Sequence, residues 1–424
     1  MNDRRIAELI AFVREHSPFY RDLYADLSGG TSNLAALPIT DHTAYWASHG
    51  VESSRLLTGP HIDGPVFQSG GTTGSPKVSV YTREEWQGMC RSFGTGLPAS
   101  GLRAGDRVAN LFYAGALYSS FVFTFGLLHE APVPTVQLPI AGSAPLEFTV
   151  AALSDFSVNV IAAPPTALCR LARHVIDTAG SLPGIRLALY SGEAIYNDQL
   201  DLLAEAFPGI TVRSIGYASV DAGVLATPVP GVTDTRVHQA LTADKVVELV
   251  DPETGEPVTR PGRPGRVVAT DLARHLMPVI RYPVGDMAEW TDYPRRRFRL
   301  LGRAEEGARV GVVTVYLEDL RTALAAVDDH GLIAGMQVVL RHRDGLDELL
   351  LRLASDTPCG ATHRADREAL ELALTGKLAV QRPMFSEEVA LGKVHPLAVE
   401  WVEPDRLTVN ARTGKLVRLL DERI

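Results

Sequence analysis

The first residues of the chain repeat an apolar pattern with helical spacing. Apolar side chains stand at i, i+3, i+4 and i+7, namely Ile6, Leu9, Ile10 and Val13. This spacing predicts an amphipathic helix that ends before Ser17–Pro18. Another helix is predicted to begin after Thr82, because Glu85 stands three positions later and completes the pattern of a capping box.

Short apolar runs alternate with helical patterns in the middle of the chain. Strands are predicted at 107–113, 158–163, 185–190 and 211–215. Between them, Leu168, Leu171 and Val175 mark one helix face, and a further helix is predicted at 197–206. Strands that alternate with helices predict an α/β fold whose sheets are mainly parallel and flanked by helices.

The pattern changes after residue 225. Apolar runs at 246–250 and 265–270 flank a turn sequence, which predicts antiparallel hairpins and a small β-rich subdomain over about 225–300. The remainder of the chain has a helical pattern near 318–326, a hairpin signal at Asp344–Gly345, and a helix and a strand at 364–377 and 397–402. These elements predict a small α+β domain.

Composition and charge narrow the class of protein. The chain has 424 residues, which indicates two or three domains, and 46% of them are hydrophobic, as in ordinary globular proteins. A net charge of −9 argues against nucleic acid or an anionic membrane as the main partner. No apolar run approaches the ~20 residues of a membrane-spanning helix, and the N-terminus does not read as a signal peptide. Three scattered cysteines favour the cytoplasm and give no metal motif.

The most distinctive stretch runs from Gln68 to Lys77, between apolar runs that predict two strands. Glycine backbones curl easily around an anion, and their N–H groups, with hydroxyls and a lysine, can bind phosphate oxygens. The candidate phosphate contacts are Ser69, Gly70, Gly71, Thr72, Thr73, Gly74 and Lys77. The spacing fits neither the P-loop nor the dinucleotide fingerprint. The alternative is a flexible surface loop.

This stretch resembles the phosphate loop of the adenylate-forming superfamily, which includes acyl-CoA synthetases, adenylation domains and luciferases. Those enzymes join a carboxylate to the α-phosphate of ATP and release pyrophosphate. Residues 16–21 and 37–40 are similar to the phenylacetate–CoA ligase branch of the superfamily.

Two strand ends resemble the nucleotide motifs of that superfamily. Gly192, Glu193 and Ala194 match a segment that contacts adenine. In the next motif the resemblance implies that Tyr217 packs on adenine and that Asp221 holds Mg²⁺. Asp221 stands where glutamate is usual, but it is still a hard oxygen ligand suited to Mg²⁺. Taken alone, it would be read as a solvated loop carboxylate.

Later segments continue the resemblance in the family's order. Asp286 matches the acid that accepts hydrogen bonds from both ribose hydroxyls, and Arg303 matches an arginine near the ribose and phosphates. Glu305 stands at the hinge position, which implies a large domain at 1–302 and a small mobile lid domain at 303–424. Lys415 matches the lysine that is essential for the first half-reaction, where it joins Lys77 and Asp221 as a catalytic residue.

The acyl pocket and the acceptor are less sharply defined by these motifs. The resemblance places Phe112, Tyr113, Gly216 and Ala218 in the acyl pocket, although the two aromatic residues could equally be core. A flat ring would fit there, so an aromatic or arylacetic acid is expected. The segment at 310–316 keeps only Gly311 of the family pattern, which puts transfer to CoA in doubt.

The resemblance thus implies an ATP- and Mg²⁺-dependent ligase that forms an acyl-adenylate and passes the acyl group to CoA or another thiol. Three alternatives stay open. The acceptor could be a phosphopantetheine carrier protein or an amine in secondary metabolism, the chain could be an amide-forming synthetase, or it could be a degenerate nucleotide-binding relative. A homodimer is expected from the resemblance alone, and no nucleic-acid or membrane partner is expected.

Overall fold

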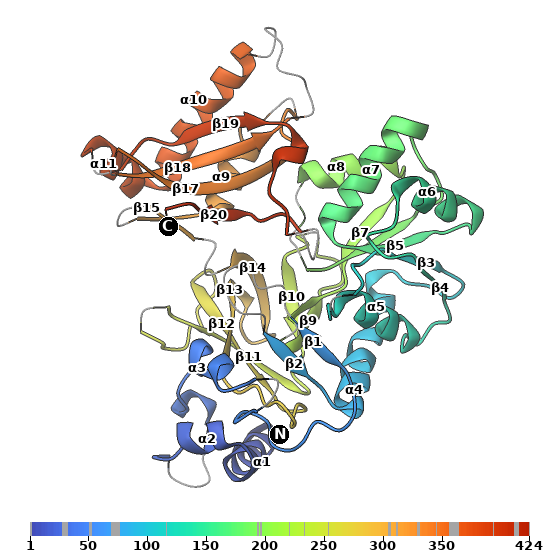
Figure 1. Ribbon diagram of the computed structural model, residues 1–424, viewed down its shortest axis with the longest axis vertical. Coiled ribbons are helices and arrows are strands. Elements are labelled where there is room, and N and C mark those ends of the chain that lie inside the picture. Colours follow the sequence, from blue (N-terminus) through green and yellow to red (C-terminus); the bar gives the residue numbers. More distant parts are fainter. Residues whose placement is uncertain are drawn as a thin grey trace. The chain divides into compact units, whose positions relative to one another are not determined.

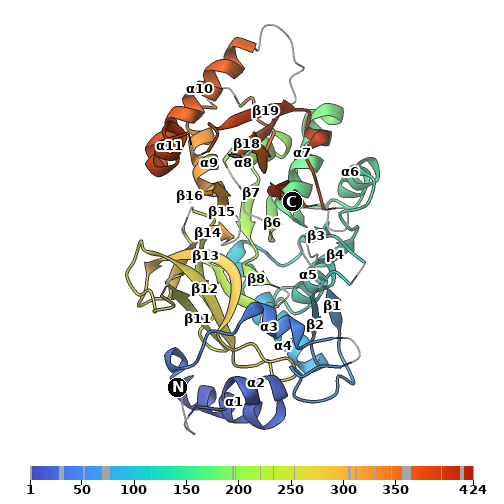
Figure 2. The same cartoon turned by 60° about the vertical axis from the view of Figure 1, so that its left-hand side comes forward.

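The chain folds into two compact units, Met1–Leu301 and Gly302–Ile424. The computed structural model describes residues 2–27, 33–50, 53–68, 77–115, 117–192, 195, 197–219, 221–232, 234–252, 254–303, 307–310, 313–328, 331–344, 346–355, 364–392, 394–410 and 415–423. Each unit has its own hydrophobic core. Figures 1 and 2 show the helices and strands of the chain.

The first unit contains the helices and strands of two large sheets. Its helices are α1 (Asn2–His16), α2 (Pro18–Leu23), α3 (His42–Ala47), α4 (Arg83–Gly94), α5 (Ser120–His129), α6 (Leu146–Asp155), α7 (Pro165–Ala179) and α8 (Asn197–Ala206), with 3₁₀ turns at Leu34–Ala36 and Leu97–Ser100. The helix pattern at 6–13 and the capping box of Thr82 and Glu85 are confirmed by α1 and α4.

A five-stranded parallel sheet forms one layer of this unit. Its order is β4 (Val136–Pro139), β3 (Arg107–Asn110), β5 (Val160–Ala163), β6 (Leu187–Tyr190) and β7 (Thr211–Ser214). Ile161 and Ala163 pack with apolar residues of α7 and α8, while Val160 and Ala162 pack with those of α4 and α5. Because successive side chains of a strand point to opposite faces, both faces of the sheet are covered, as the alternating pattern predicted.

The strand predicted at 107–113 is shorter than expected. It ends at Asn110, whose side-chain Oδ1 accepts a 3.2 Å hydrogen bond from the backbone N–H of Phe112. A side chain that bonds its own backbone two residues ahead competes with strand pairing and turns the chain. Phe112 and Tyr113 therefore follow the strand and are not part of it.

A seven-stranded sheet forms the second layer and is larger than the β-rich subdomain predicted at 225–300. Its order is β11 (Lys245–Val250), β12 (Pro264–Asp271), β13 (Tyr282–Asp292), β14 (Arg297–Arg303), β10 (Val237–Ala240), β9 (Gly223–Pro228) and β8 (Tyr217–Ser219). The predicted hairpin pairing of 246–250 with 266–270 is confirmed. The sheet begins earlier than predicted because Tyr217–Ser219 pairs antiparallel with β9.

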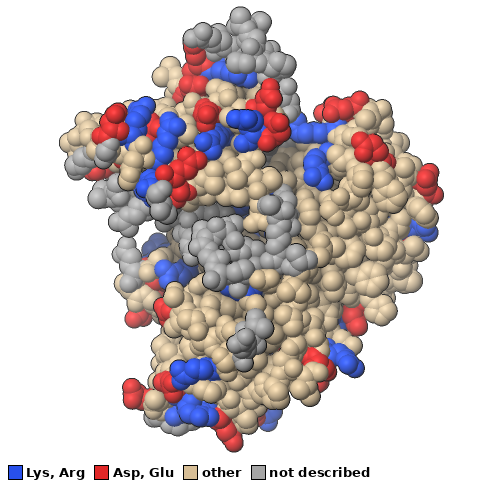
Figure 3. Space-filling view, viewed as in Figure 1, with Lys and Arg blue, Asp and Glu red and all other residues tan. Residues whose placement is uncertain are grey.

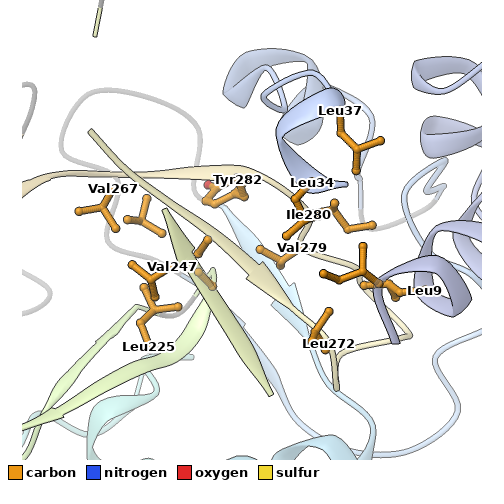
Figure 4. Close-up of a cluster of buried hydrophobic side chains, with 14 of the residues drawn as sticks. Leu9, Leu34, Leu37, Leu225, Val247, Val267, Leu272, Val279, Ile280 and Tyr282 are labelled. Atoms are coloured by element: carbon orange, nitrogen blue, oxygen red, sulfur yellow. The ribbon is translucent and has the colours of Figure 1, made fainter. Parts of the chain in front are cut away.

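The N-terminal helices pack on this antiparallel sheet. Leu9 of α1 and Leu34 and Leu37 after it share one buried cluster with Val279, Ile280 and other apolar residues (Figure 4). Tyr282, at the start of β13, belongs to the same cluster and is 1% exposed. The chain start is therefore part of the core that carries Tyr282.

The second unit is a small α+β domain. It contains the sheet β19 (Ala398–Val402), β18 (Leu346–Ala354), β17 (Gly335–Arg343) and β20 (Leu419–Asp421), the hairpin β15 (Gly307–Val310) and β16 (Val313–Tyr316), and the helices α9 (Leu317–Ala325), α10 (Arg364–Gln381) and α11 (Pro383–Ala390). The hairpin predicted at Asp344–Gly345 is confirmed, since Val338 pairs with Leu351 and Leu340 with Leu349.

Charged side chains are unevenly distributed on the surface of the first unit. Figure 3 shows few of them over α5 and β4, and on these elements Val122, Phe125 and Val136 are exposed. Among the described helices, none combines the length and the apolar character needed to cross a membrane.

Candidate functional site

The predicted phosphate loop connects two paired strands. β1 (Val66–Gln68) runs antiparallel to β2 (Val78–Val80), with Gln68 opposite Val78. Ser69, Gly70, Gly71, Thr72, Thr73 and Gly74 lie outside the described residues. The prediction of a loop between two strands is confirmed, and the described side of the loop begins at Lys77.

Lys77 contacts the short helix α3. Its Nζ donates a 2.7 Å hydrogen bond to Nε2 of His42 and stands 5.7 Å from the ring centroid of Trp46. An ammonium can only donate hydrogen bonds, so Nε2 is the acceptor and the His42 ring is neutral in this contact. This hydrogen bond therefore holds the lysine without adding a negative charge beside it.

Asp221 lies just after β8, and its two carboxylate oxygens differ. Oδ2 accepts a 3.1 Å hydrogen bond from the hydroxyl of Tyr282, which in turn accepts a 2.8 Å bond from Nε1 of Trp46. Oδ1 is buried and has no hydrogen-bond partner in the described part of the chain. Because a buried unpartnered carboxylate oxygen is costly, Oδ1 fits a cation ligand.

A buried arginine ties Asp221 to the strand that leaves the phosphate loop. Arg274 is 1% exposed, donates to the backbone oxygen of Asp221, and donates a 3.1 Å bond to the backbone oxygen of Val80. Its guanidinium lies 4.0 Å from the ring centroid of Tyr81. Burial alone would lower the pKa of Arg274, but nearby tyrosines and carboxylates, with Tyr81 the largest contributor, raise it above its ordinary value. The buried guanidinium therefore stays charged.

The predicted adenine and ribose residues touch each other. The Tyr217 hydroxyl donates a 2.5 Å hydrogen bond to Oδ2 of Asp286. Tyr217 is 8% exposed, and its ring packs at 5.9 Å, edge to face, against Phe298. The structure thus brings Tyr217 and Asp286 together, and the Tyr217 hydroxyl orients the acid that is predicted to bind ribose.

Gly216 occupies a position that other residues cannot fill. Its φ is 144°, and an added Cβ would stand 2.4 Å from the Phe93 ring and 2.7 Å from the oxygen of Ala226. Its N–H donates a 3.0 Å bond to the Ser214 hydroxyl, which lies 3.3 Å from Nε2 of His238. The backbone beside the predicted acyl pocket is therefore held by a buried polar pair.

His238 behind this turn is a buried neutral histidine. Its Nδ1 donates a 2.8 Å bond to the backbone oxygen of Arg236, so Nε2 is left to accept from Ser214. Burial lowers the pKa of His238 to about 4.

Two other residues predicted to line the acyl pocket have different exposures. Phe112 is 3% exposed and packs in the cluster of Phe93 and Ile215, whereas Tyr113 is half-buried. Ala218 packs against the same cluster as Phe112. Their role in binding an acid stays a prediction.

Several other predicted residues are only partly described. Glu193, Ala194 and Glu305 lie outside the described residues, and Gly192 is exposed with φ 84°. Arg303 ends β14, and nothing of its side chain is described. Lys415 belongs to the second unit, where its backbone oxygen accepts a 2.7 Å bond from the N–H of Asn410.

Four residues of this site were not found from the sequence: His42, Trp46, Arg274 and Tyr282. Tyr282 stands four positions before Asp286 and had no assigned role. Arg274 stands beside His275 and three residues after Asp271, so its neighbours give no signal of burial. His42 and Trp46 had no signal, since their partners are 35 and 236 residues away.

A cavity of about 460 Å³ lies elsewhere in the first unit. It is lined by Asp3, Leu34, Glu248, Trp290, Tyr293 and Arg296 among others, and by none of the predicted site residues. The described ranges contain no cluster of three or more His, Cys, Asp or Glu side chains placed to hold a metal ion. Asp221 as a lone carboxylate suits Mg²⁺, which often takes one or two protein carboxylates and completes its shell with phosphates and water.

Comparison with known proteins gives consistent matches. Residues 66–272 match the family described as AMP-binding enzyme. A phenylacetate-coenzyme A ligase of Thermus thermophilus is 28% identical over 382 residues, which cover 84% of this chain and 81% of that protein. A phenylacetate-coenzyme A ligase of Pseudomonas putida is 28% identical over 264 residues, covering 59% of this chain and 57% of that protein.

Solved structures share the fold. The crystal structure of 2-hydroxyisobutyryl-CoA ligase in the postadenylation state, in complex with 2-HIB-AMP, has a TM-score of 0.78 at 21% identity, covering 99% of this chain and 89% of that chain. The anthranilate CoA ligase AuaEII in complex with anthranoyl-AMP has a TM-score of 0.58 at 18% identity, covering 83% and 65%. At these identities the likeness shows the fold, and the predicted α/β architecture is confirmed.

Proposed function

The chain belongs to the AMP-binding, adenylate-forming enzymes, and from this membership we propose that it activates an aromatic or arylacetic acid with ATP and passes the acyl group to CoA. A carboxylate oxygen attacks the α-phosphate, pyrophosphate leaves, and an acyl-adenylate forms. A thiol sulfur then attacks the acyl carbon, and AMP leaves with the bridging oxygen.

The observation that carries this proposal is the environment of Asp221. One carboxylate oxygen is held by Tyr282, and the other is buried without a partner in the described part of the chain. Asp221 would hold Mg²⁺ through that free oxygen, and the ion, when bound, would offset the charge of the ATP phosphates.

Two lysines of the chain are proposed to offset the repulsion between the two reactants. A carboxylate and ATP are both negative, so their approach requires compensating positive charge at the α-phosphate. Lys77, which donates a 2.7 Å bond to the uncharged acceptor Nε2 of His42, is proposed to supply one ammonium to the phosphates. Lys415 is proposed to supply a second ammonium in the first half-reaction. No general base is needed, because the attacking carboxylate is already ionised.

Nucleotide binding is assigned to the Tyr217–Asp286 pair, with Gly192, Glu193, Ala194 and Arg303 as further contacts. A carboxylate matches a vicinal diol because each of its oxygens can accept one hydroxyl hydrogen bond. A carboxylate oxygen can accept more than one hydrogen bond, so the bond from Tyr217 to Oδ2 is compatible with ribose binding at Asp286.

The substrate class rests on the relatives and on the pocket residues. The curated relatives reported above are phenylacetate-coenzyme A ligases, which supports an arylacetic or aromatic acid and CoA as the acceptor. Phe112, Tyr113, Gly216 and Ala218 are proposed to line the acyl pocket. Because the segment around Gly311 departs from the family pattern, transfer to CoA is assayed separately from adenylation.

The test is acid-dependent exchange of labelled pyrophosphate into ATP over a panel of aromatic, arylacetic and fatty acids, with CoA omitted. We expect exchange with a ring-bearing acid and not with fatty acids. A second arm measures AMP release with and without CoA. Exchange without a CoA effect would replace CoA by another acceptor, and no exchange with any acid would contradict the proposed activity.

A further inference from the structure

The short helix α3 contacts Lys77 directly and is linked to Asp221 through the hydroxyl of Tyr282. We propose that α3 is a positioning element, in which His42 sets Lys77 and Trp46, acting through Tyr282, sets Asp221. This inference rests on the proposed function, because it assigns roles within the same site. Neither α3 residue belongs to a motif recognised in the sequence.

The geometry of α3 suits this role. His42 and Trp46 are four residues apart, so their side chains lie on one face of the helix. Two contacts hold the helix in place. Asp41 caps it by accepting a 2.7 Å bond from the N–H of Ala44, and Tyr45, 1% exposed, donates a 3.0 Å bond to the oxygen of Pro278. The face that carries the two side chains is therefore fixed relative to the sheet.

His42 restricts the side chain of Lys77, which is otherwise flexible. A lysine has four rotatable carbon–carbon bonds, and its ammonium takes a defined place only when acceptors hold it. The 2.7 Å bond to Nε2 of His42 and the Trp46 ring at 5.7 Å define one such place. A neutral imidazole accepts this bond without adding a negative charge beside Lys77.

The hydrogen bonds from Trp46 through Tyr282 to Asp221 have a fixed direction of donation. Trp46 Nε1 can only donate, so the Tyr282 oxygen accepts, and its own proton is directed to Oδ2 of Asp221. This arrangement turns Oδ1 of Asp221 into the oxygen without a partner among the described groups. The ring centroids of His42 and Tyr282 are 5.6 Å apart, so the residue that contacts Lys77 also packs against the residue that contacts Asp221.

Breaking the contact to Lys77 and breaking the contact to Asp221 should have different kinetic effects. Removing the acceptor with His42→Ala should raise the KM for ATP about tenfold, the usual effect of losing a hydrogen bond to a charged group. The Mg²⁺ concentration for half-maximal rate should stay unchanged. Tyr282→Phe should instead raise that Mg²⁺ concentration about tenfold, and Trp46→Phe should shift it in the same direction by less.

A conservative substitution of His42 distinguishes a role in positioning Lys77 from a role in packing alone. His42→Gln places an amide oxygen near the position of Nε2, so the KM for ATP should return to within about threefold of wild type. Matched controls are His129→Ala, an exposed histidine of α5, and Tyr24→Phe, whose buried hydroxyl has no hydrogen-bond partner within the described residues. Both controls should leave both parameters unchanged.

The measurement is ATP–pyrophosphate exchange for each variant, titrated with ATP and with Mg²⁺, together with melting temperatures with and without Mg·ATP. The proposal is overturned if His42→Gln is as defective as His42→Ala, or if Tyr282→Phe leaves the Mg²⁺ requirement unchanged. If the wild type shows no exchange with any acid, the proposed function fails separately. The nucleotide-induced melting shift then decides the inference, which predicts that His42→Ala loses the shift and His42→Gln keeps it.

Discussion

The hydroxyl of Tyr217 donates a 2.5 Å hydrogen bond to Oδ2 of Asp286, although the two residues are 69 positions apart in the sequence. Tyr217 begins β8 and Asp286 lies within β13, so the seven-stranded sheet brings them together. The aromatic residue predicted for adenine therefore also orients the acid predicted for ribose.

Removing only the Tyr217 hydroxyl should weaken ribose recognition. Tyr217→Phe keeps the ring and its contact with Phe298 but leaves Asp286 without this donor. We expect the KM for ATP to rise about three- to tenfold, because a charged hydrogen-bond acceptor loses its orienting partner. The preference for ATP over 2′-deoxy-ATP should shrink as well. Steady-state exchange with both nucleotides checks this, and an unchanged preference would mean that Tyr217 contributes its ring alone.

Replacing the buried arginine should destabilise the first unit. Arg274→Lys keeps the charge but cannot reach the oxygens of both Asp221 and Val80 with a planar fork. We expect a loss of about 2–4 kcal/mol, since a buried cation is left incompletely satisfied. Urea unfolding followed by tryptophan fluorescence measures the loss. The control is Arg83→Lys, whose side chain is 72% exposed and for which a change within about 0.5 kcal/mol is expected. Equal effects of the two variants would contradict this role.

His238 should make the first unit less stable in mild acid. Burial lowers its pKa to about 4, below the ordinary value of 6.5. Between these values the unfolded chain binds a proton that the folded chain does not, so the free energy of unfolding falls as the pH falls. The expected loss from this group between about pH 7 and 5 is about 2 kcal/mol.

Urea unfolding at the two pH values tests this expectation in wild type and in His238→Gln. The variant keeps a group that can bond Ser214 but has no titrating ring. Its stability should therefore depend less on pH by about the same amount. If wild type and variant lose equal stability on acidification, His238 does not carry the effect.

Local patterns predicted much of the fold. The capping box of Thr82 and Glu85 and the hairpin of β17 and β18 depend on neighbours in sequence, and the structure confirms both. The seven-stranded sheet was underestimated because β8 is only three residues long, and such a strand has too few positions for an alternation to be recognised.

The residues of the candidate site also fall into two groups, those that a sequence motif predicted and those that only the tertiary fold brings together. Lys77, Asp221 and Asp286 were predicted as site residues because each stands in a motif of consecutive residues. Arg274 and His42 act through partners that only the tertiary fold brings near, and a single buried cation or a histidine on a short helix leaves no periodic signal. The hydrogen bond from Tyr282 to Asp221 was missed for this reason, although both residues lie in recognised segments.

In the proposed reaction a carboxylate oxygen of the acid attacks the α-phosphate of ATP. Oxygen transfer tests it directly, with the acid identified by the exchange panel and labelled with ¹⁸O in its carboxylate. If the acyl group passes through an acyl-adenylate, the AMP released on addition of CoA carries one ¹⁸O in its phosphate, as mass spectrometry will detect. Label in inorganic phosphate together with ADP, or product formed with unlabelled AMP, would contradict this reaction.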